Sequence, residues 1–501
     1  MSALAQELIE TNLKTKHPVL NLGNCSLDGT ETELYKPLLD AHHLQKLNFT
    51  PEWYEANLNK GEWVYKNTGS FENKNKLVQI PKYLPRHLKS LILCEAGAVS
   101  EFNDLTPLKG LSKLQTLALN VEKGIDFTPL SSLISLKALN LSLTSIDNIQ
   151  FLSPLVNLQM LNLWTSKIIE ISPLQYLKKL KVLNLSADKI EDISPLGELT
   201  NLEGLTLTNS QISDISKLAS LTNLHTLDLS FNSIKNIISL KYLSNLKVLN
   251  LRNNKVEDLT PLSNLKNLNE LVISDIETSS LLFVKELRQM RKLSAENNDI
   301  QDISPLRNLK KLTYISLNDN QIEDICPLEN LKSLQELYLN NNKVEDITAL
   351  SDFTKLERLG LDNNQVSNLD PLKNLKQLTY LWLQENPIRD CRVLTELTNL
   401  ETLLMNVQYL PFPPIWFVRL NTTLNCKLGD FIDLEELPFI AKIWQFLSSD
   451  NEEQMELGEQ LALGQGWIEE DIAIHKELAF NGTLLYYGIY ELGKGLLKVN
   501  P

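Results

Sequence analysis

A repeat of constant length runs through most of this 501-residue chain. Segments of the form LxxLxL begin at fourteen positions, each 22 residues after the previous one, with no insertion or deletion. The positions are Leu114, Leu136, Leu158, Leu180, Leu202, Leu224, Leu246, Leu268, Met290, Leu312, Leu334, Leu356, Leu378 and Leu400. A period of this size predicts a solenoid, in which similar coils stack in one direction. Any function is therefore expected on one extended face.

Within a coil, the apolar residues are spaced for a short strand followed by a tight return. Leu183 and Leu185 lie two residues apart, which predicts a strand whose alternate side chains point the same way. Ile190, Ile193 and Leu196 then recur every three residues, which fits a helical or extended return path. One coil cannot bury this set alone, so neighbouring coils bury it jointly.

The coil sequence closely resembles leucine-rich repeats. Residues 312–331 (LTYISLNDNQIEDICPLENL) and 246–265 (LKVLNLRNNKVEDLTPLSNL) match the frame LxxLxLxxNxIxDIxPLxxL almost letter for letter. The 22-residue form with DIxPL is similar to the repeats of internalins and of the small leucine-rich regulator of protein phosphatase 1. The resemblance covers about four fifths of the chain. It implies an α/β solenoid, a curved leucine-rich repeat horseshoe with parallel β-strands on the concave face.

The ninth position is asparagine in seven of the later coils, while the variant coil at 268–289 carries Ile276 there. We expect the asparagine side chain to be buried and to use both its donor and its acceptor on backbone groups where the chain leaves the strand. The residues are Asn232, Asn254, Asn298, Asn320, Asn342, Asn364 and Asn386. Earlier coils carry Glu122, Thr144, Ser166, Asp188 and Ser210 instead, so we expect their turns to close less uniformly.

Segments outside the regular coils are expected to cap or interrupt the solenoid. The expected parts are a capping helix at 1–16, irregular leading repeats at 17–113 with a loop insertion at 50–87, regular repeats at 114–404 with a variant coil at 268–289, a cap at 405–430 and a small helical domain at 431–501. Helical spacing places Leu4, Leu8, Ile9 and Leu13 on one face of the first helix. The frame recurs unevenly in the leading repeats at Leu20, Leu22, Cys25, Leu27, Leu44, Leu47, Phe49, Leu88, Leu91 and Leu93.

The opening stretch LAQELIETNLKTKHPVLNLGNCSL also resembles the start of the leucine-rich segment in bacterial Roco-type proteins. In those proteins a GTPase module follows. This sequence has no GxxxxGK[ST] phosphate loop, so no GTPase part is expected within it.

Two irregular places have alternative interpretations. The insertion at 50–87 contains Trp53, Tyr54, Trp63 and Tyr65, which form either a binding lip over the concave face or aromatic anchors that fix the loop on the solenoid flank. The coil at 268–289 lacks the DIxPL stretch and predicts a short amphipathic helix from Ser279 to Gln289. Its inward residues would be Leu282, Val284 and Leu287. This coil either bends the array or is a silent variant.

Charge and composition limit the class of partner and the compartment. The net charge of −14 opposes binding to a phosphate backbone, so no nucleic acid partner is expected. The opening residues lack a positively charged region followed by an apolar stretch, and no apolar run of 18 residues occurs. We therefore expect a cytoplasmic, monomeric protein with no membrane span. The five cysteines are scattered without CxxC spacing, and Cys25 and Cys326 are expected to be small buried residues.

Strand alternation identifies the residues that face the concave side. In the early coils these are small and polar: Met160, Asn162, Val182, Asn184, Thr206, Thr226, Asp228, Val248 and Asn250. In the late coils they are Tyr314, Ser316, Glu336, Tyr338, Arg358, Gly360, Tyr380, Trp382, Thr402 and Leu404. Aromatic side chains and an arginine therefore appear only in the late set.

This contrast predicts a protein-binding site on the late coils, because Tyr, Trp and Arg dominate interface energetics. The candidate residues are Tyr314, Glu336, Tyr338, Arg358, Asp362, Tyr380, Trp382 and Gln384, with Asp319 and Glu385 also in the polar rim. The alternative is cross-strand stabilisation, with the aromatics packed on one another and Arg358 stacked on Tyr380. Trp164 and Phe231 are a weaker, isolated candidate site.

Motifs for catalysis are missing, including HExxH, GxSxG and EF-hand spacing, so no catalytic residue, metal or cofactor is expected. Two function classes remain. The first is a non-enzymatic scaffold that recognises a protein on the concave face of the late repeats. The second is an effector or regulatory enzyme in which the C-terminal helical region carries the activity and the repeats bind the substrate.

Overall fold

The computed structural model of the chain describes residues 2–67, 74–93, 102–121, 124–164, 167–186, 189–388, 390, 392–405, 455–457 and 459–461. The chain forms two compact units, Met1–Ile276 (unit 1) and Glu277–Pro501 (unit 2). The division falls inside the variant coil at 268–289. The predicted cap at 405–430 and helical domain at 431–501 lie outside the described residues, apart from residue 405 and the helical residues 455–457 and 459–461.

Short parallel strands recur once per coil in both units. In unit 1 they are β1 (Val19–Asn21), β2 (Lys46–Asn48), β5 (Ser90–Ile92), β6 (Thr116–Ala118), β7 (Ala138–Asn140), β8 (Met160–Asn162), β9 (Val182–Asn184), β10 (Gly204–Thr206), β11 (Thr226–Asp228), β12 (Val248–Asn250) and β13 (Glu270–Val272). In unit 2 they are β14 (Lys292–Ser294), β15 (Tyr314–Ser316), β16 (Glu336–Tyr338), β17 (Arg358–Gly360), β18 (Tyr380–Trp382) and β19 (Thr402–Leu404). Unit 1 also contains the antiparallel hairpin of β3 (Glu52–Asn57) and β4 (Glu62–Asn67).

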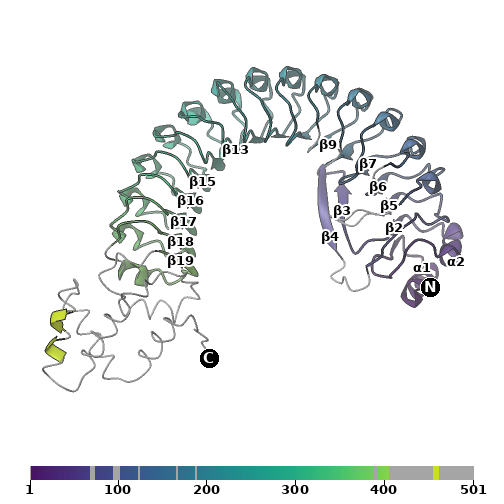
Figure 1. Cartoon of the computed structure of the whole chain (residues 1–501), viewed down its shortest axis with the longest axis horizontal. Helices are drawn as coiled ribbons and strands as arrows, with labels where there is room; N and C mark the ends of the chain where they lie inside the picture. The colour runs from purple at the N-terminus through teal and green to yellow at the C-terminus, as the bar shows by residue number, and fades with distance from the viewer. Residues whose placement is uncertain are drawn as a thin grey trace. The chain divides into compact units, whose positions relative to one another are not determined.

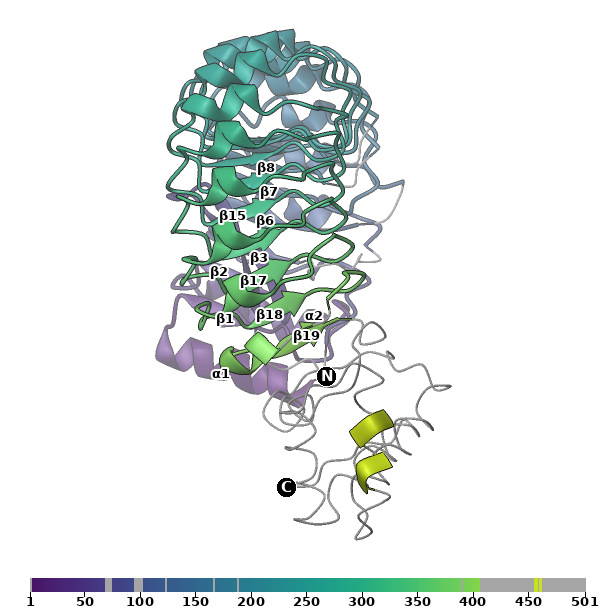
Figure 2. The ribbon, with the colours of Figure 1, turned by 90° about the vertical axis from the view of Figure 1, so that its left-hand side faces the viewer.

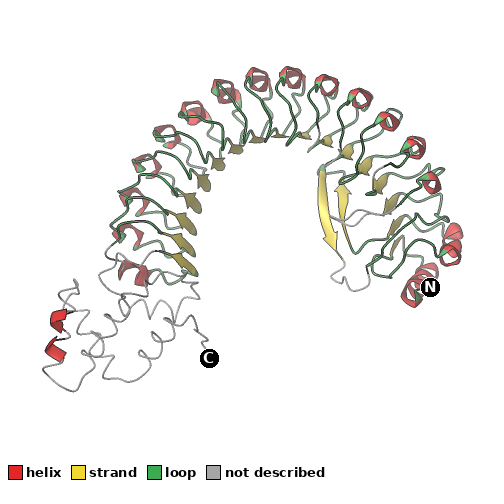
Figure 3. Ribbon diagram, viewed as in Figure 1, coloured by secondary structure: helices red, strands yellow, loops and turns green. Residues whose placement is uncertain are grey.

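The sequence period sets the strand register. Leu205 pairs with Leu227, and Leu337 pairs with Leu359, so each residue lies beside its equivalent 22 positions along the chain. In each unit the strands line the concave side and the helical turns lie on the convex side (Figure 1, Figure 3). Figure 2 shows the strands of unit 2 as successive parallel rungs. The predicted α/β solenoid with strands on its concave face is confirmed.

The return path of most coils is a 3₁₀ helix, as the three-residue apolar spacing allows. In unit 1, where α1 (Ala3–Thr15) and α2 (Thr32–Tyr35) come first, the 3₁₀ helices are Lys36–Asp40, Thr106–Leu108, Thr128–Ser132, Gln150–Leu152, Ser172–Tyr176, Ser194–Glu198, Ser216–Ser220, Ile238–Tyr242 and Thr260–Asn264. In unit 2 they are Leu282–Glu286, Ser304–Leu306, Cys326–Leu328, Thr348–Leu350, Asp370–Leu372 and Arg392–Glu396. The DIxPL stretch starts many of them: Asp192 Oδ1 accepts the Ser194 N–H at 2.8 Å, and the proline that follows has no N–H that would need an acceptor.

The frame residues form the core, and the asparagine ladder closes the turns as predicted. Asn364 is buried, donates from Nδ2 to the carbonyls of Leu339, Leu361 and Asp362 at 2.9, 3.0 and 3.1 Å, and accepts the Val344 N–H at 2.9 Å. Each such side chain joins two neighbouring coils. In the early coil at 136–157 the equivalent Thr144 is fully buried, and its hydroxyl has no hydrogen-bond partner within the part of the chain that the structure describes.

Three predictions about single side chains are wrong. Leu4 is 44% exposed, because α1 turns Ala5, Ile9 and Asn12 inward instead. Leu282 is exposed at the start of a 3₁₀ helix that is shorter than the predicted amphipathic helix, whereas Val284 and Leu287 are buried as expected. Cys326 is exposed, because the first position of its 3₁₀ helix lies on the solvent side of the convex face. Cys25 is buried, and this burial raises the pKa of its thiol to about 11.

Candidate functional site: the concave patch of unit 2

The candidate residues on the late strands form two rows across β15 to β18. One row pairs Tyr314, Glu336, Arg358 and Tyr380 in register, and the other pairs Ser316, Tyr338, Gly360 and Trp382. Alternation along a strand places both rows on the same concave face. We name the set of Tyr314, Glu336, Tyr338, Arg358, Tyr380 and Trp382 the concave patch.

In the first row, a glutamate and an arginine form a charge pair, and the arginine stacks on an aromatic ring. The Glu336 carboxylate accepts the Tyr338 hydroxyl at 2.7 Å, and Arg358 Nη1 lies 3.8 Å from Glu336 Oε2. The Arg358 guanidinium lies 4.8 Å from the centroid of the Tyr380 ring, so the predicted stacking of these two side chains is confirmed. The Arg358 side chain is still 46% exposed, which leaves much of the guanidinium open to contact.

The second row depends on a glycine. Gly360 lies between Tyr338 and Trp382 in the register, and the two rings meet across it at 5.7 Å between centroids. Tyr314 lies 5.8 Å from Tyr338, and Tyr380 lies 6.3 Å from Trp382. Four rings are therefore continuous across four strands, in contacts worth about 1 kcal/mol each.

The polar rim is less exposed than the sequence predicts. Asn340 accepts the Asp362 N–H on Oδ1 at 2.8 Å, and Asp362 accepts the Gln384 N–H on Oδ1 at 2.7 Å. Asn318 makes the same contact with the Asn340 N–H at 2.9 Å. Asp362 and Gln384 are consequently half-buried in a ladder that links successive coils, which corrects their interpretation as exposed rim residues.

This ladder replaces a local cap that the early coils use. In coils such as that of β12, Asn250 Oδ1 accepts the N–H of Arg252, two residues later. At the equivalent position β16 and β18 carry Tyr338 and Trp382, which offer no such acceptor. The N–H two residues further along, that of Asn340 or Gln384, is accepted instead by Asn318 or Asp362 of the preceding coil, which explains how aromatics are tolerated at this position.

Burial raises the pKa of Asp362, beside the concave patch, and of Tyr338 within it. It raises the pKa of the Asp362 carboxyl from 3.8 to about 6, partly offset by the hydrogen bond from the Gln384 N–H. Burial, and then the hydrogen bond to Glu336, raises the pKa of Tyr338 to about 12. Tyr338 therefore remains a hydroxyl donor at neutral pH. The pKa of Asp362, about 6, lies about one unit below neutral pH.

The remaining candidates lie apart from the concave patch. Asp319 and Glu385 occupy the left-handed turn position after β15 and β18, with φ of 55° and 51°, and both are exposed. Trp164 and Phe231 are each 45% exposed in unit 1. Phe231 has a φ of 58° and lies 5.8 Å from the Arg252 guanidinium. Trp164 and Phe231 lie in coils three repeats apart, and the described residues do not join them into one site.

The hairpin of unit 1 covers the leading part of its concave face. Trp53 packs against the fully buried Ile92 and Ala118, on β5 and β6, and a Cβ added at Gly61 in the hairpin turn would lie 3.1 Å from Val182 on β9. The hairpin therefore spans the strands from β5 to β9 on their concave side (Figure 1).

This cover changes the reading of the early concave positions. Met160 on β8 is only 1% exposed although its strand position faces the concave side, and β8 lies between β6 and β9, which the hairpin reaches. Trp53 acts as an anchor, but on the concave face and not on the flank. On the other side of the hairpin, Tyr54 and Tyr65 remain 41% and 45% exposed and pack edge to face at 5.8 Å.

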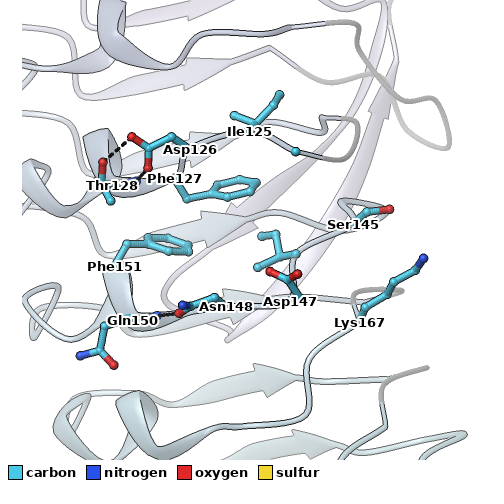
Figure 4. Close-up of a pocket in the computed structure, with 12 residues that line it drawn as sticks. Ile125, Asp126, Phe127, Thr128, Ser145, Asp147, Asn148, Gln150, Phe151 and Lys167 are labelled. Atoms are coloured by element: carbon cyan, nitrogen blue, oxygen red, sulfur yellow. Dashed lines mark hydrogen bonds between the residues drawn. The ribbon is translucent and has the colours of Figure 1, made fainter.

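A cavity of about 490 Å³ lies between two coils of unit 1 (Figure 4). Phe127 and Phe151 stack at 5.4 Å along it. Its polar residues include Asp126, which accepts the Thr128 N–H and hydroxyl at 2.9 and 2.7 Å, bonds that hold its pKa below the usual value. These groups begin 3₁₀ helices, and their hydrogen bonds are made within the coil, so the cavity is a gap between neighbouring coils. Among the described residues, no cluster of His, Cys, Asp or Glu has a metal-binding arrangement.

Comparison with known proteins agrees with this geometry. The family described as "Leucine Rich repeats (2 copies)" matches residues 156–198, 200–242, 288–330 and 332–374. An internalin of Listeria monocytogenes, InlF, is 35% identical over 57% of this chain and 85% of its own, with a TM-score of 0.56. The chain belongs to the leucine-rich repeat family. Its internalin-like repeats are thus confirmed.

Other solved leucine-rich repeat proteins share the fold. One from Leptospira interrogans is 25% identical over 68% of this chain and 95% of its own, with a TM-score of 0.59. The ectodomain of the Arabidopsis receptor kinase HAESA, in complex with a peptide hormone ligand, is 20% identical over 73% of this chain and 66% of its own, with a TM-score of 0.52. No curated protein matches this leucine-rich repeat protein. None of the helices in its described part has the length and apolar character to cross a membrane.

Proposed function

We propose that this leucine-rich repeat protein is a non-enzymatic scaffold that binds a protein partner through the concave patch of unit 2. The observation that carries the proposal is that the four aromatic rings of the concave patch contact one another in series, beside an arginine whose side chain is half-exposed. Tyr, Trp and Arg are the residue types that contribute most to protein interfaces. A leucine-rich repeat fold suits such a scaffold because its strands present side chains in fixed order.

The contacts within the concave patch favour binding as well as folding. Arg358 is held between Glu336 and Tyr380, and Trp382 is held between two tyrosine rings. Side chains that are already ordered lose less entropy when a partner binds. Cross-strand stabilisation and partner recognition are therefore compatible roles for the same residues.

The dimensions of the patch favour a protein over a metabolite. Four adjacent strands spaced by ~4.8 Å extend over about 14 Å, which suits a peptide segment or the surface of a folded domain. Small-molecule sites are usually closed and mostly apolar. An open ladder leaves one side of a small ligand in water.

A photo-crosslinking experiment tests the proposal. A photoreactive phenylalanine analogue replaces Tyr338 in the full chain, and the same analogue replaces Tyr242, which is 55% exposed on the convex side of unit 1. The crosslinks formed in a lysate of the native host are identified by mass spectrometry. We expect one protein to crosslink from position 338, to do so less when Trp382 is replaced by Ala, and not to crosslink from position 242. Equal labelling from both positions would refute the proposal.

A further inference from the structure

After three of the late strands, a side-chain oxygen accepts a backbone N–H of the next coil. This oxygen belongs to an amide in two coils and to a carboxylate in one. Asn318 and Asn340 accept the N–H of the next coil at 2.9 and 2.8 Å, and Asp362 accepts that of Gln384 at 2.7 Å. A side-chain amide oxygen therefore makes the same bond in the same place. The fold does not require a negative charge at position 362.

The negative charge at position 362 is disfavoured by its surroundings in the folded chain. Burial disfavours the ionised form, as the raised pKa of Asp362 indicates. Its Oδ1 accepts the Gln384 N–H, whereas its Oδ2 accepts no hydrogen bond from the described residues. An asparagine would keep the hydrogen bond from the Gln384 N–H and avoid the cost of burying the charge, so the contacts of the described residues give the carboxylate no structural role that an amide would lack.

The neighbouring charges do not compensate Asp362. On β16 and β17, Glu336 and Arg358 lie 3.8 Å apart, and Arg358 stacks on Tyr380 of β18. The next coil presents the neutral Gln384 beside Asp362 and then Glu385, a second acidic group. Among the described residues no positive group is paired with Asp362, so its carboxylate is open to a positive group of a partner.

The aromatic rings fit the stem of such a group. Asp362 follows Gly360 by two residues, and across Gly360 the rings of Tyr338 and Trp382 meet at 5.7 Å. Lysine and arginine carry long aliphatic stems that pack on apolar surface while the charged end reaches a carboxylate. The net charge of −14 on the chain also attracts a basic partner.

We propose that Asp362 is the charged subsite of the concave patch and receives a lysine or arginine side chain of the partner, whose aliphatic stem lies on Tyr338 and Trp382. This inference rests on the proposed function and adds the chemistry of the partner. A neutral or acidic segment would leave the desolvated carboxylate unpaired, which disfavours its binding.

A selection with random linear peptides tests the inference on the full chain. Peptides are displayed and selected on the wild-type protein, and those that also bind Trp382→Ala are discarded. We expect the remaining peptides to share a lysine or arginine at a fixed position. Synthetic peptides with that residue replaced by norleucine should bind about tenfold more weakly.

The Asp362→Asn variant provides the matched comparison, because it keeps the acceptor for the Gln384 N–H. Its affinity for the basic peptide should be about tenfold lower than that of the wild type, and its affinity for the norleucine peptide should be unchanged. Wild-type affinity for the basic peptide should also fall as the pH is lowered through about 6, where Asp362 is protonated, and that of Asp362→Asn should not.

Two outcomes separate this inference from the proposed function. Peptides that require Trp382 but lack a basic residue, or that bind Asp362→Asn as tightly as wild type, would overturn the inference and leave the concave patch as a binding site. If no selected peptide requires Trp382, the proposed function fails and the inference fails with it.

Discussion

Replacement of Asp362 by asparagine is expected to stabilise unit 2 at neutral pH. Burial raises the pKa of this carboxyl from 3.8 to about 6. Because the folded pKa lies above the unfolded one, the favourable effect of the acid form is fully present below the unfolded pKa and is lost as the pH rises through about 6. Asparagine keeps the hydrogen bond from the Gln384 N–H and carries no charge at any pH.

The size of the effect follows from the shift. The pKa of Asp362 rises by about two units, and each unit corresponds to about 1.4 kcal/mol, so the gain in stability has an upper limit of about 3 kcal/mol. Asp362 is only half-buried, so solvent screening reduces the expected gain to about 1 kcal/mol. The gain should disappear below about pH 4, where aspartate is protonated in both states.

Hydrogen exchange of the backbone amides in β17 and β18 is the suitable assay, because a solenoid opens locally and not as one cooperative unit. Exchange rates are corrected for their intrinsic pH dependence before Asp362→Asn is compared with wild type. Asp362→Ala serves as the control, since it removes the charge and also the acceptor, and should be less stable than Asp362→Asn by about 1 kcal/mol. A loss of protection in Asp362→Asn at neutral pH would refute the reasoning.

Three further predictions address the supports of the site. In Gly360→Ala the new Cβ would lie 2.8 Å from both Asn340 Nδ2 and Oδ1. This should release the Asp362 N–H and lower stability by about 1–3 kcal/mol, and unchanged thermal unfolding would contradict it. Asn364→Ala removes four hydrogen bonds, two of which join its coil to the preceding one, and should cost about 3 kcal/mol. Hydrogen exchange of Val344 as slow as in wild type would argue against this role. Trp53→Ala should free the hairpin and speed peroxide oxidation of the buried Met160 severalfold, measured by mass spectrometry. Unchanged oxidation would mean that the hairpin does not cover β8.

Local periodicity made the coil predictable. The spacing of Leu183 and Leu185 identifies a strand, and the position of Asn364 identifies a buried turn residue, because both roles are determined within one coil and its neighbours. The same register placed Arg358 beside Tyr380, where the two side chains stack. Interactions between equivalent positions of adjacent coils are therefore readable from a repeat.

Features that depend on distant segments or on a single exception were not predictable in this way. Met160 is buried on the stretch of the concave face that a hairpin about a hundred positions earlier in the chain spans, and no periodic pattern reports where that hairpin lies. The sequence predicts an exposed rim position for Asp362, because its contact with the backbone of the next coil depends on the turn geometry after β17. Gly360 carried a usable signal, since a residue without a side chain in an aromatic row lets its neighbours meet.

The affinity of the partner for three proteins tests the central claim most directly. The partner identified by crosslinking at position 338 is titrated against wild type, Trp382→Ala and Tyr242→Ala by calorimetry. Binding through the concave patch predicts that Trp382→Ala loses about 2 kcal/mol or more, roughly thirtyfold in Kd, while Tyr242→Ala binds as wild type does. An unchanged Kd for Trp382→Ala would contradict the account.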